Sequence, residues 1–227
     1  MKIQYLRWDT ENFGFKVGLV EVCSEDNFSL ELVEQLAKNE KYKLVYIKST
    51  YLLNCPSIFC DEKLVYKQLN NAIETLQFPN IESYTLKTVE AELYELSLRS
   101  GKYSRYNLDN KFPNECFQRL YYKWIYNSIY TDYATDVLVY RINGKVVGLL
   151  SYKNDKENSN IGIIAVNPNY QRYGIGSKLL KHYQSLLGNN IKTMTVVTQG
   201  INQIARFFYE KNGYNISSRT YIYHLWI

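Results

Sequence analysis

One stretch of this 227-residue chain decides the fold, and it reads Ile161-Gly162-Ile163-Ile164-Ala165-Val166-Asn167-Pro168-Asn169-Tyr170-Gln171-Arg172-Tyr173-Gly174-Ile175-Gly176-Ser177-Lys178-Leu179-Leu180. It begins as an apolar run that is typical of a buried strand and ends at Pro168. A Gln-Arg-x-Gly-x-Gly turn follows and leads into a segment with helical periodicity. The apolar residues on one face of that segment are Leu179, Leu180, Tyr183, Leu186 and Leu187. The pattern predicts a strand, a sharp turn and an amphipathic helix in direct succession.

The two glycines of this turn, Gly174 and Gly176, let the backbone turn sharply and expose its N–H groups where the helix begins. Those N–H groups have no partner within the helix, and the helix dipole adds positive potential there. The turn therefore predicts a site for an anion, most naturally a diphosphate. A plain glycine-rich turn is the structural alternative, and the ordered succession of strand, turn and helix disfavours it.

These residues resemble the acyl-CoA-binding motif of the GNAT acetyltransferase superfamily, which is usually Gln/Arg-x-x-Gly-x-Gly/Ala after a strand. A second motif of that superfamily follows, with the strand 194–198, then Asn202, Ala205, Tyr209 and the closing Asn-Gly-Tyr of 212–214. The resemblance implies acetyl-CoA as a co-substrate. We expect no metal, because the four cysteines lack metal-ligand spacing and the chain has only two histidines. The residues that the resemblance assigns to acetyl-CoA are Ile164, Ala165, Val166, Gln171, Arg172, Tyr173, Gly174, Ile175, Gly176, Ser177 and Asn202.

The same resemblance makes Tyr209 the catalytic residue, because its hydroxyl would face the departing sulfur. A tyrosine has a pKa of about 10 and an alkyl thiol about 8.5, so a hydrogen bond to the thiolate is favoured over full proton transfer. The alternative for Tyr209 is a core aromatic, and the alternative for Asn202 is an N-cap of the next helix. No base for the amine stands out; Asp109 and Asp132 are weak candidates that fit a helix cap or a surface charge equally well.

A narrower resemblance covers the chain from about residue 6 onward. The segments 8–15, 104–109 and 120–128 are similar to motifs of the bacterial dTDP-fucosamine N-acetyltransferases, which acetylate dTDP-4-amino-4,6-dideoxygalactose. The resemblance implies a nucleotide-linked amino sugar as acceptor and a role in cell-surface polysaccharide biosynthesis. The residues we expect to bind the acceptor, through cations and aromatic faces, are Phe13, Lys102, Arg105 and Tyr106.

Other functions stay open beside this one. The segment 101–112 also has the composition of a solvated loop. The acceptor could instead be a protein N-terminus, an antibiotic or a polyamine, although cationic acceptors call for acidic pockets. A CoA-binding regulator without turnover is the alternative outside enzymes. Relatives are often dimers, which makes the aromatic-rich segment 221–226 a candidate homodimer surface.

Composition narrows the class of protein. Hydrophobic residues make up 46% of the chain, and no apolar stretch approaches the length of a membrane span, so we expect a folded protein without a membrane partner. The start lacks a signal-peptide core, which predicts a cytoplasmic location. The four cysteines lack metal-ligand spacing, and we expect them to be reduced. The net charge of +5 suits anionic ligands, but no basic stripe with a nucleic-acid motif is present.

The periodicity predicts an α/β fold in two parts that meet at 77–80. Residues 1–79 are expected to form a smaller α/β domain, with strands and a helix near 2–7, 16–22, 28–39 (the helix) and 43–48. Residues 80–227 are expected to form the GNAT fold, a mixed, mostly antiparallel sheet flanked by helices. Its hairpin is the most specific local prediction, because Asn143-Gly144 joins two apolar strands. The other expected elements are a strand near 82–87, helices near 89–100 and 115–130, strands near 160–166 and 192–198, a helix near 202–211 and a strand near 219–226.

Overall fold

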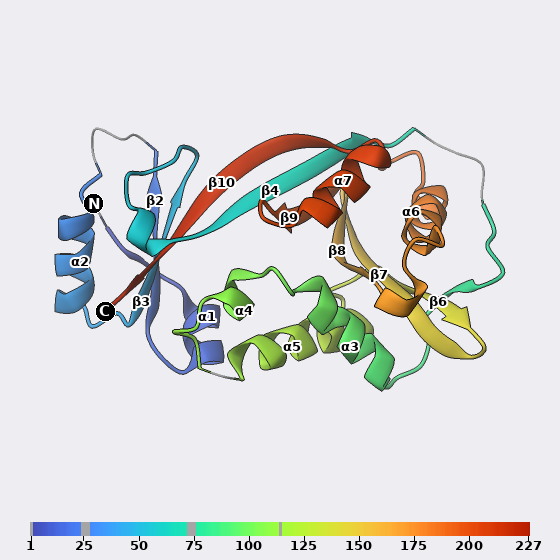
Figure 1. Ribbon diagram of the computed structural model, residues 1–227, viewed down its shortest axis with the longest axis horizontal. Coiled ribbons are helices and arrows are strands. Elements are labelled where there is room, and N and C mark those ends of the chain that lie inside the picture. The colour runs from blue at the N-terminus through green and yellow to red at the C-terminus, as the bar shows by residue number, and fades with distance from the viewer. Residues whose placement is uncertain (1, 24–27, 72–75, 114) are drawn as a thin grey trace.

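The computed structural model describes residues 2–23, 28–71, 76–113 and 115–227. Within them a single sheet runs through the molecule in the strand order β1-β2-β3-β10-β4-β9-β8-β7-β6-β5 (Figure 1). The strands are β1 (Gln4–Tyr5), β2 (Val17–Val22), β3 (Leu44–Ser49), β4 (Phe59–Leu69), β5 (Ile81–Ser83), β6 (Asp136–Ile142), β7 (Lys145–Asp155), β8 (Asn158–Val166), β9 (Thr193–Gln199) and β10 (Asn215–Trp226). Two pairs, β2–β3 and β8–β9, are parallel and the others are antiparallel. The predicted mixed, mostly antiparallel sheet is confirmed.

Helices cover both faces of this sheet. They are α1 (Arg7–Phe13), α2 (Leu30–Asn39), α3 (Ala91–Ser100), α4 (Arg105–Leu108), α5 (Cys116–Tyr130), α6 (Ile175–Leu186) and α7 (Gln203–Lys211), with short 3-10 turns η2 (Pro56–Ile58) and η3 (Pro168–Tyr170). Residues of α6 and α7 pack with β4 and β6–β9 on one face, and residues of α3 and α5 pack with β6–β8 on the other. The described residues contain no helix that is both long and apolar enough to cross a membrane.

The hairpin forms as predicted. β6 and β7 pair from Asp136 to Ile142. The two turn residues, Asn143 and Gly144, adopt φ values of 50° and 78°, the left-handed conformation that an Asn-Gly turn requires. The predicted helices of the C-terminal part are likewise present, with ends that differ from expectation by only a few residues.

Two elements of the N-terminal part differ from expectation. The predicted strand 2–7 is limited to β1, because Arg7 already begins α1, which ends at Gly14 in a left-handed cap (φ 79°). β4 was not expected at all, although it is eleven residues long. Its buried Leu64 and Tyr66 alternate with half-buried neighbours, which is the pattern of a strand with one covered face.

The sheet passes from the N-terminal to the C-terminal part without interruption. β10 pairs with β3 on one side and with β4 on the other, and β4 pairs in turn with β9. The division of the chain into domains 1–79 and 80–227 stays a prediction.

The expected use of 221–226 as a dimer surface is wrong for a physical reason: this segment is an inner strand, and Ile222, Tyr223 and Leu225 are buried.

Candidate functional site

The central feature of the sheet is a gap between β8 and β9. Their parallel ladder has four pairs and ends at Ile161 and Val196. Beyond that point β8 stays paired with β7 as far as Val166, and β9 stays paired with β4 as far as Gln199. The second halves of these two strands therefore diverge, and each leads into a helix, α6 or α7 (Figure 1).

Two residues of β8 direct their backbone into the gap. The N–H groups of Ile163 and Asn167 donate to β7, at 3.0 Å to the Ser151 hydroxyl and 2.8 Å to the Val147 carbonyl. Because alternate residues of a strand point their N–H and C=O groups to opposite edges, those of Ile164 and Val166 point away from β7. Ala165, by the same alternation, faces β7. Of the three residues predicted on this strand, Ile164 and Val166 therefore border the gap.

The turn after β8 leads into α6, and within the described part of the chain the N-terminus of this helix has no side-chain cap. Arg172 and Gly174 adopt φ values of 68° and 76°, and α6 begins at Ile175. Lys178 donates to the Gly174 carbonyl at 2.9 Å, and among the described residues no side chain caps this helix. The N–H groups of the first turn, from Ile175 to Ser177, therefore remain available to an external acceptor. The fold brings the predicted residues 171–177 together at one end of the gap, where the Gln171 side chain also donates to the Val166 carbonyl at 3.1 Å.

The two glycines of the turn have different surroundings. A Cβ added to Gly174 would have no atom within 4 Å, so the space beside it is open. A Cβ added to Gly176 would stand 3.1 Å from the Phe208 ring and 3.8 Å from Val166. Gly176 thus permits the close approach of α6 and α7, and a larger residue would force the Phe208 ring to shift. The sequence could not distinguish these roles, because both positions are glycines in one short motif.

Tyr209 lies on α7 and is 4% exposed. Its ring packs beside those of Tyr66, Phe208 and Tyr214, with centroids 5.6, 5.4 and 6.0 Å away. Burial raises the pKa of its hydroxyl well above the usual 10, so the group stays neutral. Within the described part of the chain the hydroxyl has no hydrogen bond, yet it is not among the fully enclosed unpartnered oxygens. Tyr209 is therefore a core aromatic that carries a neutral hydroxyl.

Asn202 forms the N-cap of α7. Its side-chain oxygen accepts from the Ala205 N–H at 3.2 Å. This contact is the helix-cap alternative that the sequence left open. A role of the remaining amide N–H groups toward a ligand stays a prediction.

Arg105 begins the short helix α4 in the segment predicted to bind the acceptor. Its Nη2 donates to the Tyr106 hydroxyl at 2.5 Å, and its guanidinium lies over the rings of Tyr106 and Tyr46, 4.3 and 5.1 Å from their centroids. Its Nε is enclosed and has no hydrogen-bond partner among the described residues. The structure brings Arg105 and Tyr106 into a mostly buried charged cluster instead of a solvated loop.

The other two residues predicted to bind the acceptor are placed differently. Phe13 is 5% exposed and packs against Tyr106 and Phe112, with centroid distances of 5.7 and 5.0 Å, so it joins α1 to the 101–112 segment. Lys102 is exposed, and its ammonium lies 5.4 Å from the centroid of the Tyr103 ring.

Asp109 contacts two side chains of β10 through its carboxylate. Its Oδ2 faces His224 Nδ1 at 2.6 Å and accepts from Trp226 Nε1 at 2.8 Å. Burial opposes ionisation of Asp109, but these hydrogen bonds hold its pKa below the usual value, which makes it a poor base. Ligand-type atoms of Cys60, Asp109 and His224 lie within 4.8 Å of one another, a grouping that the sequence spacing did not suggest. The Arg105 charge acts on both Cys60 and His224, which disfavours a cation there, and the predicted lack of a metal stays a prediction.

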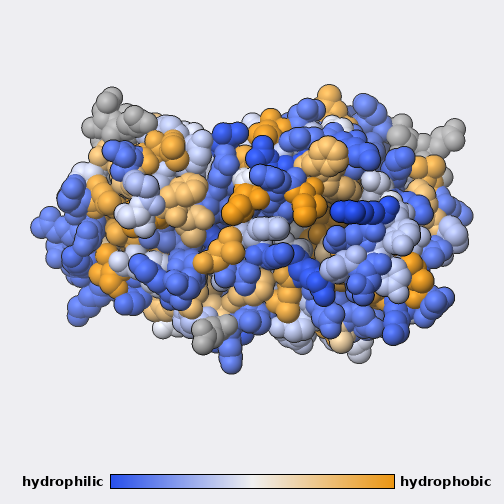
Figure 2. Space-filling model, in the orientation of Figure 1, coloured by the Kyte–Doolittle hydropathy of each residue, from blue (hydrophilic) through white to orange (hydrophobic). Residues whose placement is uncertain are grey.

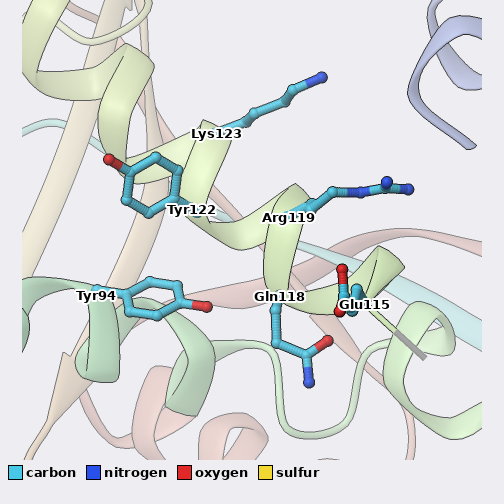
Figure 3. A pocket seen from close by; sticks show the side chains of 6 residues that line it. All are labelled: Tyr94, Glu115, Gln118, Arg119, Tyr122 and Lys123. Atoms are coloured by element: carbon cyan, nitrogen blue, oxygen red, sulfur yellow. The ribbon is translucent and has the colours of Figure 1, made fainter.

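A shallow pocket of about 300 Å³ lies elsewhere, between α3 and α5 (Figure 3). None of the predicted site residues lines it. Two of its cations, Arg119 and Lys123, reach toward α1, where they donate to the Asn12 backbone oxygen at 3.2 Å and its side-chain oxygen at 2.7 Å. Through these contacts the two cations connect α5 to α1.

Apolar side chains are exposed beside the gap. Figure 2 shows them in the middle of this face, over α7. On α7 they include Ile204 and Phe207, which are 73% and 68% exposed, and Tyr173 of the turn is 73% exposed. Such a surface beside the open turn 171–177 would suit a ligand with both phosphate and apolar parts.

Comparison with known proteins agrees with this geometry. Residues 134–216, which include the gap, the turn and Tyr209, match the family described as Acetyltransferase (GNAT) domain. Residues 134–216 are therefore similar to a GNAT acetyltransferase domain.

Among individual relatives, the chain is similar to the spore coat polysaccharide biosynthesis protein SpsD of Bacillus subtilis. The identity is 27% over 140 residues, which is 58% of this chain and 46% of that protein. The chain thus spans about half the length of this curated relative.

Solved structures share the fold at low sequence identity. A conserved protein of unknown function from Staphylococcus epidermidis superposes with a TM-score of 0.69 at 14% identity, over 97% of this chain and 89% of that one. A GCN5-related N-acetyltransferase from Sphaerobacter thermophilus superposes with a TM-score of 0.57 at 12% identity, over 92% and 73% of the two chains.

Proposed function

We propose that this protein is an acetyl-CoA-dependent N-acetyltransferase. The observation that carries the proposal is the gap between β8 and β9, which lies beside the uncapped start of α6. A pantetheine arm can pair with the backbone of Ile164 and Val166 as an added strand would. The N–H groups of 175–177 suit its diphosphate. Tyr209, which is neutral and lies on α7, would complete the set by facing the departing sulfur.

Catalysis in this proposal needs few protein groups. A β8 backbone N–H facing the gap would stabilise the developing oxyanion of the thioester. The amine attacks the carbonyl carbon in a ternary complex, and the C–S bond breaks. The raised pKa of Tyr209 makes full proton transfer to the thiolate unfavourable, so the hydroxyl would donate a hydrogen bond to it. Solvent would then complete protonation of the sulfur.

We infer that the acceptor is a nucleotide-linked amino sugar, with a dTDP sugar as the first choice. Three observations support this choice: the motifs at 8–15, 104–109 and 120–128, the similarity to a polysaccharide biosynthesis protein, and the Arg105–Tyr106 cluster. Another amine, such as a protein N-terminus or an antibiotic, is the competing acceptor. A CoA-binding regulator is the competing function without turnover.

The test is direct. The protein is incubated with acetyl-CoA and a panel of dTDP- and UDP-amino sugars, peptides and small amines, and thiol release is followed. Turnover with dTDP-4-amino-4,6-dideoxygalactose above all other amines supports the proposed acceptor. Acetyl-CoA binding by calorimetry without turnover of any amine would favour the regulator.

A further inference from the structure

Part of the sheet face opposite α7 is left uncovered by the helices of the described residues. Val197 of β9 is 48% exposed, and it pairs with the half-buried Val65 of β4. Val65 pairs in turn with the exposed Ser218 of β10. The neighbouring residues Val196 and Tyr66 belong to the core under α6 and α7, so this row lies on the other face, the side of α3 to α5. Three adjacent strands thus present an open strip.

The strip ends at a buried carboxylate. The next row, made of Gln199, Lys63 and Thr220, is half-buried. In the row after it, Asp61 is 7% exposed and pairs with the buried Ile222. Along β4 this face therefore becomes more covered, from the half-buried Val65 and Lys63 to the buried Asp61.

The sheet registers place Asp61 at the same position along the strand direction as the end of β8, which borders the gap. The registers align Ile161 of β8 with Val196 of β9 and Val196 with Tyr66 of β4. Five residues further along, β8 reaches Val166 and the antiparallel β4 reaches Asp61. β9 lies between β4 and β8, and because β8 and β9 diverge at this level, Asp61 stands more than two strand spacings, or about 10 Å, from β8, on the far side of the gap.

The Asp61 carboxylate has no ion pair or hydrogen bond with a side chain of the described residues, and its oxygens are not among the fully enclosed unpartnered atoms. The backbone N–H of Glu62 faces it, and Arg105 is near enough to act on it electrostatically. A buried carboxylate that lacks a full partner and remains open on one side is a binding position for a cation or an N–H donor.

We propose that Asp61 receives the amino group of the acceptor and takes up the proton that this group must lose before attack. This role rests on the proposed acetyltransferase function. The acceptor would lie along the open strip of β4, β9 and β10 and reach the thioester through the gap.

The proton balance is complete without a further reactant. An ammonium N–H bond breaks and the proton passes to the Asp61 carboxylate, directly or through one water. The freed lone pair attacks the thioester carbon and the C–S bond breaks. The second proton, which the nitrogen loses as the amide forms, goes to the thiolate through solvent. Asp61 returns its proton to solvent, so the products are the amide, the CoA thiol and one proton.

Asp61 is suited to this exchange. Burial has the larger effect and raises the pKa of its carboxyl to about 6, while the positive charge of Arg105 acts to lower that pKa. A base with a pKa near the working pH combines a useful population of the ionised form with a useful basicity. The titratable or charged groups that act on Asp61, or on which it acts, are Cys60, Glu62, Lys63, Arg105, Tyr106 and Tyr121.

The experiment compares Asp61→Asn with Asp155→Asn, in which the replaced carboxylate is exposed at the end of β7. Acetyl-CoA and dTDP-4-amino-4,6-dideoxygalactose are the substrates, or the best amine of the panel if the wild type prefers another. Asp61→Asn should lower kcat/KM for the amine by about 10²–10⁴-fold and abolish the acidic limb near pH 6, with the Kd of acetyl-CoA unchanged. Asp155→Asn should behave as the wild type.

Each outcome of this experiment either supports or refutes the role of Asp61. A folded Asp61→Asn protein with a wild-type rate and pH profile overturns the role of Asp61 and leaves the acetyltransferase function standing. A wild-type protein that binds acetyl-CoA but acetylates no amine overturns both proposals. If Asp61→Asn does not fold, Asp61→Glu keeps the carboxylate but moves it by one methylene: a lowered kcat with the acidic limb retained supports the role, and an unchanged kcat refutes it.

Discussion

Gly174→Ala offers a matched test of the phosphate turn, with Gly144→Ala as its control. Both glycines have a left-handed φ, 76° and 78°, and an added Cβ would have no atom within 4 Å at either position. The backbone cost is therefore the same for both, about 1–2 kcal/mol of folding stability. Any difference between the variants in acetyl-CoA binding must come from their location.

The expected difference follows from the contacts that an N–H of this turn can make. At Gly174 the new Cβ projects into the open space where the diphosphate is proposed to bind, and relief of the strained φ would re-aim the adjacent N–H groups. Loss of one charge-assisted hydrogen bond costs about 1.5–3 kcal/mol. The Kd for acetyl-CoA should then rise about 10- to 100-fold in Gly174→Ala. In Gly144→Ala, at the tip of the β6–β7 hairpin, it should not change.

Calorimetry at one salt concentration measures both affinities, and thermal denaturation measures both stabilities. Similar losses of Tm with a weakened Kd in Gly174→Ala alone would support the site. Equal acetyl-CoA affinities in the two folded variants would refute the assignment of the diphosphate to residues 171–177.

Three further predictions concern catalysis, packing and pH. Tyr209→Phe should lower turnover up to about 10²–10⁴-fold and leave the Kd of acetyl-CoA unchanged; near-normal turnover in a folded variant would leave Tyr209 only its packing role. Gly101→Ala should lower the Tm strongly, because its Cβ would stand 2.1 Å from the Tyr121 ring, and an unchanged Tm would contradict this close packing. Folding raises the pKa of Asp61 to about 6, so its contribution to stability is present below its unfolded pKa and is lost as the pH rises through 6. A shift of about 2 units corresponds to about 3 kcal/mol, and Asp61→Asn should therefore have a higher Tm than the wild type at pH 8 but not at pH 4; equal Tm differences at both pH values would contradict it.

The parts of the site that could be predicted from the sequence are those in which chemistry is local. A strand, a Gly-x-Gly turn and a helix follow each other within twenty residues, so the sequence around Gly174 and Gly176 was sufficient to predict the uncapped helix start. The Asn143-Gly144 hairpin was predictable for the same reason. The roles of these residues toward acetyl-CoA remain predictions.

The remaining features depend on contacts between distant segments. Asp61 approaches the gap only because β4 inserts between β9 and β10, which join the sheet more than a hundred residues later. The short apolar run around Leu64 and Tyr66 gave the one signal for that strand. Arg105 is enclosed by aromatic rings from its own segment and from β3, which no spacing in the sequence reveals.

The position of β10 has a consequence for synthesis of the chain. β3 and β4 are complete by residue 69, yet β10, which begins at Asn215, lies between them. Until the residues of β10 have left the ribosome, each of these two strands keeps an unsatisfied edge that can pair with another chain. A chain that ends at Tyr214 would leave the sheet in two separate pieces. We therefore expect incomplete chains to aggregate and to depend on chaperones, whereas the finished chain seals both edges with a single strand.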